Sequence, residues 1–162
     1  MGTDHDFDRV YREAGPGLWR ALYAFAGGRR DIAEEALAEA FARAVEHQER
    51  IRSPVPWIYR TAFRVARREL DEERRYASAE AEAGELDATP IDLQELVAAL
   101  RTLSANQRAA IVLRFEGDLS VSEIADRMGL SSATVRVHIH RARKKLRALL
   151  GADETSDEVT DA

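Results

Sequence analysis

The chain contains no cysteine among its 162 residues, which excludes disulfide bonds, thiolate metal ligands and a thiol nucleophile. It also lacks any apolar run that approaches the roughly 20 residues of a membrane-spanning helix. Its first residues are polar and acidic, unlike those of a secretory signal peptide. With 45% hydrophobic and 33% charged residues, we expect a globular, cytoplasmic protein without membrane insertion.

Charges of the two signs are segregated along the chain. Residues 1–76 carry 14 basic and 14 acidic side chains, whereas residues 77–100 carry six acidic and no basic ones. Residues 101–150 carry ten basic and four acidic side chains, and residues 151–162 carry five acidic and no basic ones. The formal net charge of −5 is therefore an average over one strongly basic segment and its acidic neighbours. Such segregation indicates separate modules.

Hydrophobic residues recur with helical spacing nearly throughout, and no stretch alternates with the period of a strand. This predicts an all-α fold of two small helical domains joined by an acidic linker. We expect domains over residues 1–76 and 93–150, a flexible acidic linker over 77–92 and an acidic tail over 151–162.

In the first domain, glycine and proline predict the helix ends. Gly15-Pro16-Gly17 is expected to interrupt the first helical stretch, and Asp31 to cap the next helix. Ser53-Pro54-Val55-Pro56 is expected to form a non-helical loop before a long helix over Trp57–Arg75. One side of that long helix is rich in arginine: Arg60, Arg64, Arg67 and Arg68.

The segment from Ser120 to Leu150 has the pattern of a helix-turn-helix, with a turn at Gly129. Ser120 stands at capping-box spacing from Glu123, and Ser131 precedes the second helix. Its inward stripe is expected to be Val135, Ile139, Ala142, Leu146 and Leu149. Its outward residues are expected to be Ser132, Thr134, Arg136, Val137, His138, His140, Arg141, Lys144 and Lys145. A basic, outward-facing second helix favours DNA binding in the major groove over a merely solvated surface.

Nothing in the sequence supports catalysis. The four histidines include no pair at i, i+4 spacing, and the glycine-containing stretches are typical of turns and not of a phosphate-binding loop. We therefore expect a protein that is not an enzyme and has no cofactor and no metal site.

Leu103 to Leu150 resembles region 4 of bacterial sigma factors, and is most similar to the extracytoplasmic-function (ECF) group. The matching residues run from LSANQRAAIVLRFEGDLSVSEIADRMGL through SSATVRVHIHRARKKLRALL, with a TVR-x-x-I-x-RAR-x-x-L ending. Residues 7–75 resemble region 2 more loosely, through DIAEEALAEAFARAV and the later WIYRTA.

This resemblance implies a sigma factor that binds core RNA polymerase and directs promoter-specific transcription initiation. Region 4 of the family binds the −35 promoter element and the β flap, while region 2 binds the β′ clamp and engages and melts the −10 element. An anti-sigma factor is a further implied partner.

The family's motifs assign site residues to this chain. The implied base-recognising residues are Arg136, Val137, His140 and Arg141. The residues best placed for phosphate are Ser131, Ser132, Thr134, Arg143 and Lys144. Those facing single-stranded −10 DNA are Arg52, Tyr59, Arg60 and Arg64. The residues for the polymerase clamp are Glu35, Glu39 and Arg43.

Three positions depart from the family's pattern. Ala38 stands where relatives usually carry Gln, and Arg64 and Arg68 stand where they usually carry Asn and Asp. The arginines suggest more phosphate contact or an altered promoter preference. Two alternative hypotheses remain: a stand-alone helix-turn-helix regulator of the LuxR-like kind, and a divergent sigma-like protein that acts as a decoy.

Overall fold

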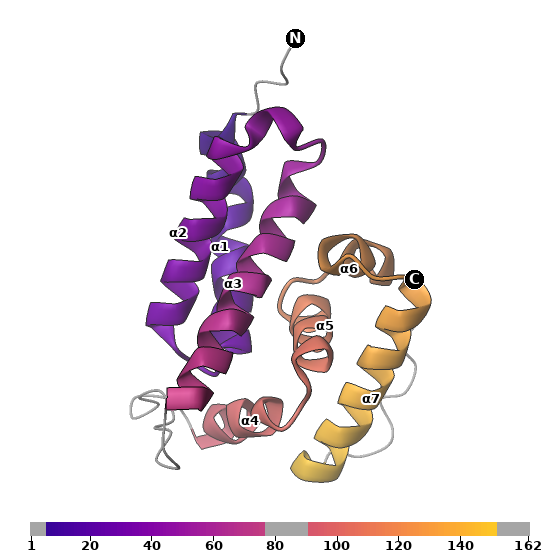
Figure 1. Cartoon of the computed structure of the whole chain (residues 1–162). Coiled ribbons are helices and arrows are strands. Elements are labelled where there is room, and N and C mark those ends of the chain that lie inside the picture. The colour runs from indigo at the N-terminus through magenta and orange to yellow at the C-terminus, as the bar shows by residue number, and fades with distance from the viewer. Residues whose placement is uncertain (1–5, 77–90, 152–162) are drawn as a thin grey trace. The chain divides into compact units, whose positions relative to one another are not determined.

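The computed structural model describes residues 6–76 and 91–151 (Figure 1). All regular structure within these ranges is helical, with seven α-helices and one short 3-10 helix. The helices belong to two units, which confirms the predicted all-α class with two helical bodies. The expected linker over 77–90 and tail over 152–162 lie outside the described residues.

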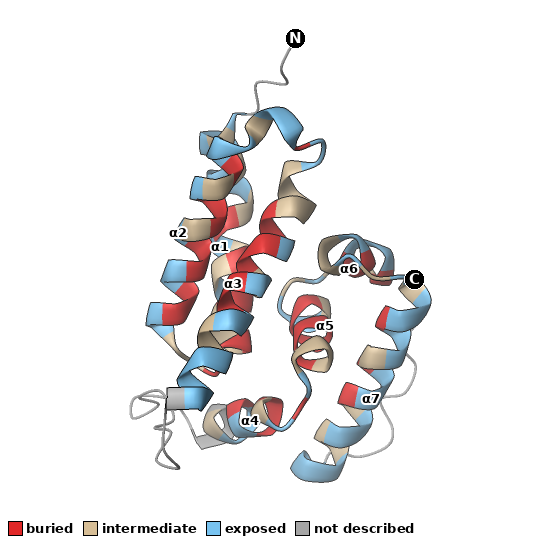
Figure 2. Ribbon diagram, in the orientation of Figure 1, coloured by how far each residue is buried: buried red, intermediate tan, exposed pale blue. Residues whose placement is uncertain are grey.

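The first unit is a bundle of three long helices. They are α1 (Phe7–Phe25), α2 (Arg30–Glu46) and α3 (Pro54–Tyr76), with the 3-10 helix Gln48–Arg50 before α3. Each of the three packs on the other two, and buried residues line the sides that they turn toward one another (Figure 2). Its largest fully buried side chains are Leu18, Leu22, Phe25, Ile58 and Val65.

The prediction that Gly15-Pro16-Gly17 interrupts the first helix is wrong, because α1 continues through Pro16. A proline disfavours the helical conformation at the residue before it through clashes with that residue's N–H and Cβ. Here that residue is Gly15, which has no Cβ. Pro16 itself is exposed, so water can reach the carbonyl that loses its helical partner.

The predicted loop over residues 53–56 is also wrong, since α3 already begins at Pro54. Pro54 and Pro56 lie in the first turn of α3, where backbone N–H groups have no intrahelical acceptor and a proline therefore removes no bond. Asp31 does not cap α2 either. The N-cap position is Arg29, and Asp31 lies in the first turn.

The described part of the second unit, residues 91–151, contains four helices. They are α4 (Ile91–Arg101), α5 (Ala105–Phe115), α6 (Val121–Met128) and α7 (Ser132–Leu150). The start of α4 shows that the first helix of this unit includes two residues expected in the linker. The long α7 packs against all three of the others, and Ser104 caps α5 through a capping box with Gln107.

Candidate nucleic-acid interface

The start of α6 and the turn between α6 and α7 are held by local hydrogen bonds at the cap positions that the sequence predicted. The Ser120 hydroxyl accepts from the Glu123 N–H at 3.1 Å, and the Glu123 carboxylate accepts from the Ser120 N–H at 3.2 Å. The hydrogen bond that the Ser120 N–H donates to this carboxylate is the largest cause of a lowered pKa of Glu123. Gly129 ends α6 with a left-handed φ of 68°, and the Ser131 hydroxyl accepts from the Thr134 N–H at 3.1 Å. The two helices are thereby joined in a defined helix-turn-helix.

A small apolar core orients α7 on its neighbours. Val135, Ile139 and Ala142 are buried, as is Ile124 on α6, so the first half of the predicted inward stripe is confirmed. The stripe does not continue to the end of α7, because Leu149 is 54% exposed. The spacing alone therefore predicted too long a buried stripe.

The four implied base-recognising residues lie on the side of α7 opposite to this core. Arg136, Val137, His140 and Arg141 are all exposed, with 45% exposure even for the apolar Val137. At about 100° and 1.5 Å per residue they occupy one face of the helix over about 8 Å. Since α7 contains no acidic residue, this face is suited to a negatively charged groove.

The five side chains expected to contact phosphate differ from one another in exposure and in the contacts that they make. Lys144 and Thr134 are exposed and Ser132 is half-buried. The Ser131 hydroxyl caps α7 and also pairs with the Thr134 hydroxyl at 2.8 Å. The Arg143 guanidinium lies over the ring of Phe115, 5.3 Å from its centroid. Two of the five residues expected at phosphate are therefore already engaged within the unit, Ser131 as the helix cap and Arg143 in the cation–π contact.

Two residues predicted to face outward from α7 are partly engaged within the unit. His138 is half-buried, and its Nδ1 atom is shielded from solvent, so its outward assignment is wrong. Lys145 is exposed, but its Nζ donates to the Thr102 carbonyl at 3.1 Å. This contact joins α7 to the turn that follows α4.

In the first unit, the side chains implied for −10 DNA divide into exposed and buried. Arg52, Arg60 and Arg64 are exposed. Tyr59 is only 7% exposed, so its ring belongs to the bundle core and is not available to stack on a base. Trp57, two residues earlier on the same helix, is half-buried.

The residues implied for the polymerase clamp lie on α2 beside an ion-pair network. Glu39 pairs with Arg43, and it also binds Arg68 of α3 at 3.3 Å. Glu35 is exposed. Partial burial, followed by the carboxylates of Glu35 and Glu72, raises the pKa of Glu69, which indicates that acidic side chains of α2 and α3 gather here. Arg68 is therefore bound by the acidic residues of this network.

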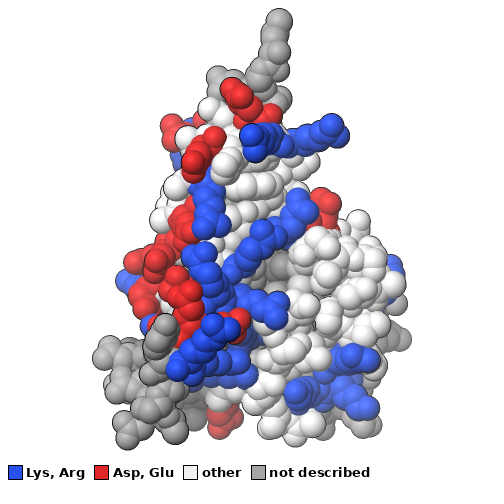
Figure 3. All heavy atoms as spheres, in the orientation of Figure 1, with Lys and Arg blue, Asp and Glu red and all other residues white. Residues whose placement is uncertain are grey.

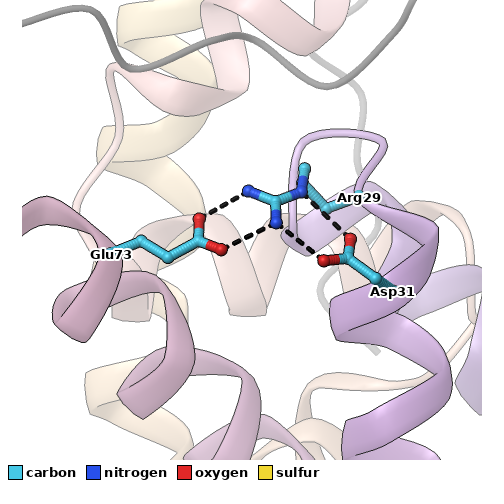
Figure 4. A network of polar contacts seen from close by, with 3 residues as sticks. All are labelled: Arg29, Asp31 and Glu73. Carbon is cyan, nitrogen blue, oxygen red and sulfur yellow. Dashed lines mark hydrogen bonds and ion pairs between the residues drawn. The ribbon is translucent and has the colours of Figure 1, made fainter. Parts of the chain in front are cut away.

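A second network was missed by the sequence analysis. The Arg29 guanidinium donates to both carboxylate oxygens of Glu73 at 2.5 and 2.7 Å, and to Asp31 at 2.7 and 3.0 Å (Figure 4). The hydrogen bonds that Arg29 donates to the carboxylates of Glu73 and Asp31 raise the pKa of Arg29, and its guanidinium lowers the pKa of Asp31. The network links the start of α2 to the C-terminal part of α3, since Arg29 and Glu73 are 44 residues apart in sequence. No pattern among neighbouring residues predicts such a pair.

Within the described ranges, no group of three or more acidic, histidine or cysteine side chains could hold a metal ion. No helix in the same ranges is long and apolar enough to span a bilayer.

Residues 93–146 match the family model "Sigma-70, region 4". Over 154 residues the chain is 30% identical to the ECF RNA polymerase sigma factor SigL of Mycobacterium tuberculosis, and the match covers 87% of this chain and 86% of that relative. The chain belongs to the ECF RNA polymerase sigma factors. It is also 30% identical to the ECF sigma factor EcfG of Rhodopseudomonas palustris, with 85% and 83% of the two chains covered.

Solved structures agree with this membership of the ECF sigma factors. CnrH, in complex with the cytosolic domain of CnrY, matches with a TM-score of 0.68 and 25% identity over 91% of this chain and 89% of CnrH. RpoE of Bartonella quintana, in complex with the anti-sigma factor NepR, matches with a TM-score of 0.66 and 25% identity over 92% and 99%.

As an ECF sigma factor, the protein directs promoter-specific transcription initiation by RNA polymerase and is not an enzyme. The predicted family and function are confirmed. Because the similarity extends over both units, it supports the sigma-factor hypothesis against a stand-alone LuxR-like regulator, which would share only the helix-turn-helix.

Proposed function

We propose that the second unit of this sigma factor recognises the −35 element through the exposed face of α7. The observation that carries the proposal is that Arg136, Val137, His140 and Arg141 share one exposed face of a helix held by the helix-turn-helix. Arg136 and Arg141 are suited to donate to guanine O6 and N7, and Val137 to contact a thymine methyl group. Thr134 and Lys144 then contact phosphate, which positions the helix without specifying sequence.

The first unit engages and melts the −10 element in this proposal. Arg52, Arg60 and Arg64 supply exposed positive charge around the start of α3, where the unpaired strand would lie. Tyr59 is left out, because its ring is part of the core. Charge from arginine, more than stacking on an aromatic ring, thus holds the strand in this chain.

Core RNA polymerase is the assembly partner. The exposed Glu35, with Glu39 and Arg43 beside it, presents charge for the β′ clamp, and the second unit would bind the β flap. The chain would act in the cytoplasm, where promoter DNA and polymerase are found. We also propose an anti-sigma factor as a regulatory partner, since CnrH and RpoE were both solved in complex with a second protein, the latter a named anti-sigma factor.

Genome-wide mapping of transcription starts after overexpression tests this function and yields both promoter elements. The expected result is a set of new starts that share one pair of elements, each reproduced by run-off transcription with the purified chain and core polymerase. Co-elution with core polymerase but no run-off product would support the decoy hypothesis instead. Sequence-specific DNA binding by the chain alone, without co-elution, would support an autonomous regulator.

A further inference from the structure

The Glu39 carboxylate, one of the groups proposed for the polymerase clamp, is held by two arginines of the first unit. Arg43, one turn along α2, donates to Oε1. Arg68 approaches from α3, and its Nη2 lies 3.5 Å from Oε1 and 3.3 Å from Oε2 of Glu39. Both oxygens of this carboxylate are therefore engaged within the chain.

Charge is consequently distributed unevenly over the residues proposed for the clamp. Glu35 is exposed and forms no ion pair with any basic residue that the structure describes, so its negative charge is presented to solvent. The side chain of Glu39 is 27% exposed and lies between two guanidinium groups, so the local charge there is positive. A positive group of a partner would be attracted at Glu35 but opposed at Glu39.

Arg68 differs from Arg43 in its place within the bundle. Arg43 lies on the same helix as Glu39, whereas Arg68 links two helices and is 29 residues away in sequence. Figure 3 shows acidic side chains mostly over α2 and basic side chains over α3, side by side along the boundary between the two helices. The guanidinium of Arg68 also lies 3.8 Å from the Glu69 carboxylate. The pair with Glu39 can therefore open without leaving Arg68 far from a carboxylate.

We propose that Arg68 competes with core RNA polymerase for the Glu39 carboxylate and thereby lowers the affinity of this chain for the polymerase. The inference rests on the proposed function, in which Glu39 meets the β′ clamp. A positively charged group of the clamp binds Glu39 fully only after Arg68 has given up its contacts with the two oxygens. The free energy of the Arg68–Glu39 pair is then subtracted from that of assembly.

The exposure of the pair limits the size of this effect. The side chains of Arg68 and Glu39 are 47% and 27% exposed, and solvent weakens ion pairs of this kind. Opening the pair is expected to reduce the affinity for core polymerase by about two- to fivefold. Higher salt should shrink this difference, because it screens the attraction between the two side chains.

The test is a double-mutant cycle on the full chain with core polymerase in the absence of DNA. Arg68→Gln should raise the affinity for core polymerase by about two- to fivefold at low salt. Glu39→Gln should lower it. Adding Arg68→Gln to Glu39→Gln should change nothing further, because the carboxylate that Arg68 and the polymerase share is gone. Fluorescence anisotropy of the labelled chain measures the four dissociation constants.

Two further variants separate competition from a general effect of charge and from loss of folding. Arg67→Gln removes the same charge from the adjacent, exposed position, which forms no ion pair with a described residue, and should leave the affinity unchanged. Arg68→Met keeps the aliphatic stem without the charge and should give the same gain as Arg68→Gln. Urea denaturation of each variant checks that the first unit is folded.

Unchanged or lower affinity of the folded variants at position 68 would overturn the inference, because Arg68 would then support the fold or bind the polymerase itself. An equal gain in the Glu39→Gln background would overturn it as well, since the gain would not arise from Glu39. Both results leave the proposed function intact. If Glu39→Gln binds core polymerase as tightly as the unsubstituted chain does, Glu39 is not at the clamp, and that part of the proposed function falls together with the inference.

Discussion

In the proposed function, some exposed side chains of α7 give sequence specificity in DNA binding and others add affinity only. Arg136 and Lys144 are both exposed, basic residues of the same helix, yet their proposed ligands differ. In the proposed complex Arg136 faces base edges, where a bidentate contact is worth about 1–3 kcal/mol in discrimination. Lys144 would face phosphate, which every sequence presents equally.

We therefore expect Arg136→Ala and Lys144→Ala to have different signatures. Arg136→Ala should weaken holoenzyme binding to the mapped promoter by about 1–3 kcal/mol and relax the preference at one position of the −35 element. Lys144→Ala should weaken binding to all promoter variants alike and reduce the salt slope by about 0.9. Binding to a set of singly substituted −35 elements at several salt concentrations distinguishes the two. Equal loss on every element for Arg136→Ala would contradict its base-recognising role.

The turn between α5 and α6 depends on two adjacent residues with unusual backbone requirements. A Cβ added to Gly117 would lie 2.7 Å from the Leu113 carbonyl oxygen, and Asp118 has a φ of 50°. Gly117→Ala should lower the free energy of unfolding of the second unit by about 1–3 kcal/mol, because backbone must move. Asp118→Gly should raise it by about 0.5–1 kcal/mol, because glycine tolerates the left-handed region. Thermal and urea denaturation measure both, and the same sign for the two variants would refute the argument.

At the scale of elements, ion pairs between helices supplement the apolar core of the first unit. The Arg29–Glu73 pair is bidentate and partly shielded, with side-chain exposures of 25% and 45%, so it differs from the exposed i, i+4 pairs on single helices. Such geometry fixes the relative position of α2 and α3 more firmly than charge alone.

We expect Glu73→Gln to destabilise the first unit by about 0.5–1.5 kcal/mol after allowance for solvent screening. Glu72→Gln is the matched control, because Glu72 is adjacent and exposed, and its carboxylate lies near that of Glu69. The control should be neutral or slightly stabilising. Urea unfolding of both variants at neutral pH and low salt measures the difference. Equal midpoints would show that the Arg29–Glu73 pair adds nothing.

The same network predicts a dependence of stability on pH. The Arg29 guanidinium lowers the pKa of Asp31 from its ordinary value of 3.8. The contribution of Asp31 is therefore fully present above that value and is lost as pH falls through the lower, folded-state pKa. We expect unfolding midpoints of the unsubstituted chain to fall more steeply below pH 4 than those of Asp31→Asn. Parallel curves for the two proteins across this range would contradict the coupling.

At the scale of the whole molecule, the net charge of −5 and the local basic surfaces affect DNA binding at different distances from the DNA. Exposed charges separated by more than about 8–10 Å are largely screened at physiological salt, so local arginines and not the total charge determine contact with phosphate. The acidic surplus nevertheless opposes approach of the free chain to DNA. In the proposed function polymerase offsets this repulsion by holding both units on one promoter, because the second contact would then be intramolecular.

We accordingly expect the free chain to bind its promoter at least on the order of 100-fold more weakly than the holoenzyme does. Fluorescence anisotropy with a labelled promoter fragment, at one salt concentration, compares the two directly. Core polymerase alone provides the background. Equal affinity of the free chain and the holoenzyme would favour an autonomous DNA-binding regulator.

The sequence by itself determined the features that depend on neighbouring residues. Capping at Ser104, Ser120 and Ser131, the turn at Gly129 and the inward stripe from Val135 to Ala142 all arise from contacts within a few residues. The all-α class and the helix-turn-helix followed from them. The family resemblance was equally visible, because the residues that carry it are contiguous.

Only the tertiary structure decided what depends on distant contacts. It placed Tyr59 in the core, bound Glu39 to Arg68, and joined Arg29 to Glu73. Pairs of this kind depend on which side chains the folded bundle brings together, and periodicity along the chain does not contain that information.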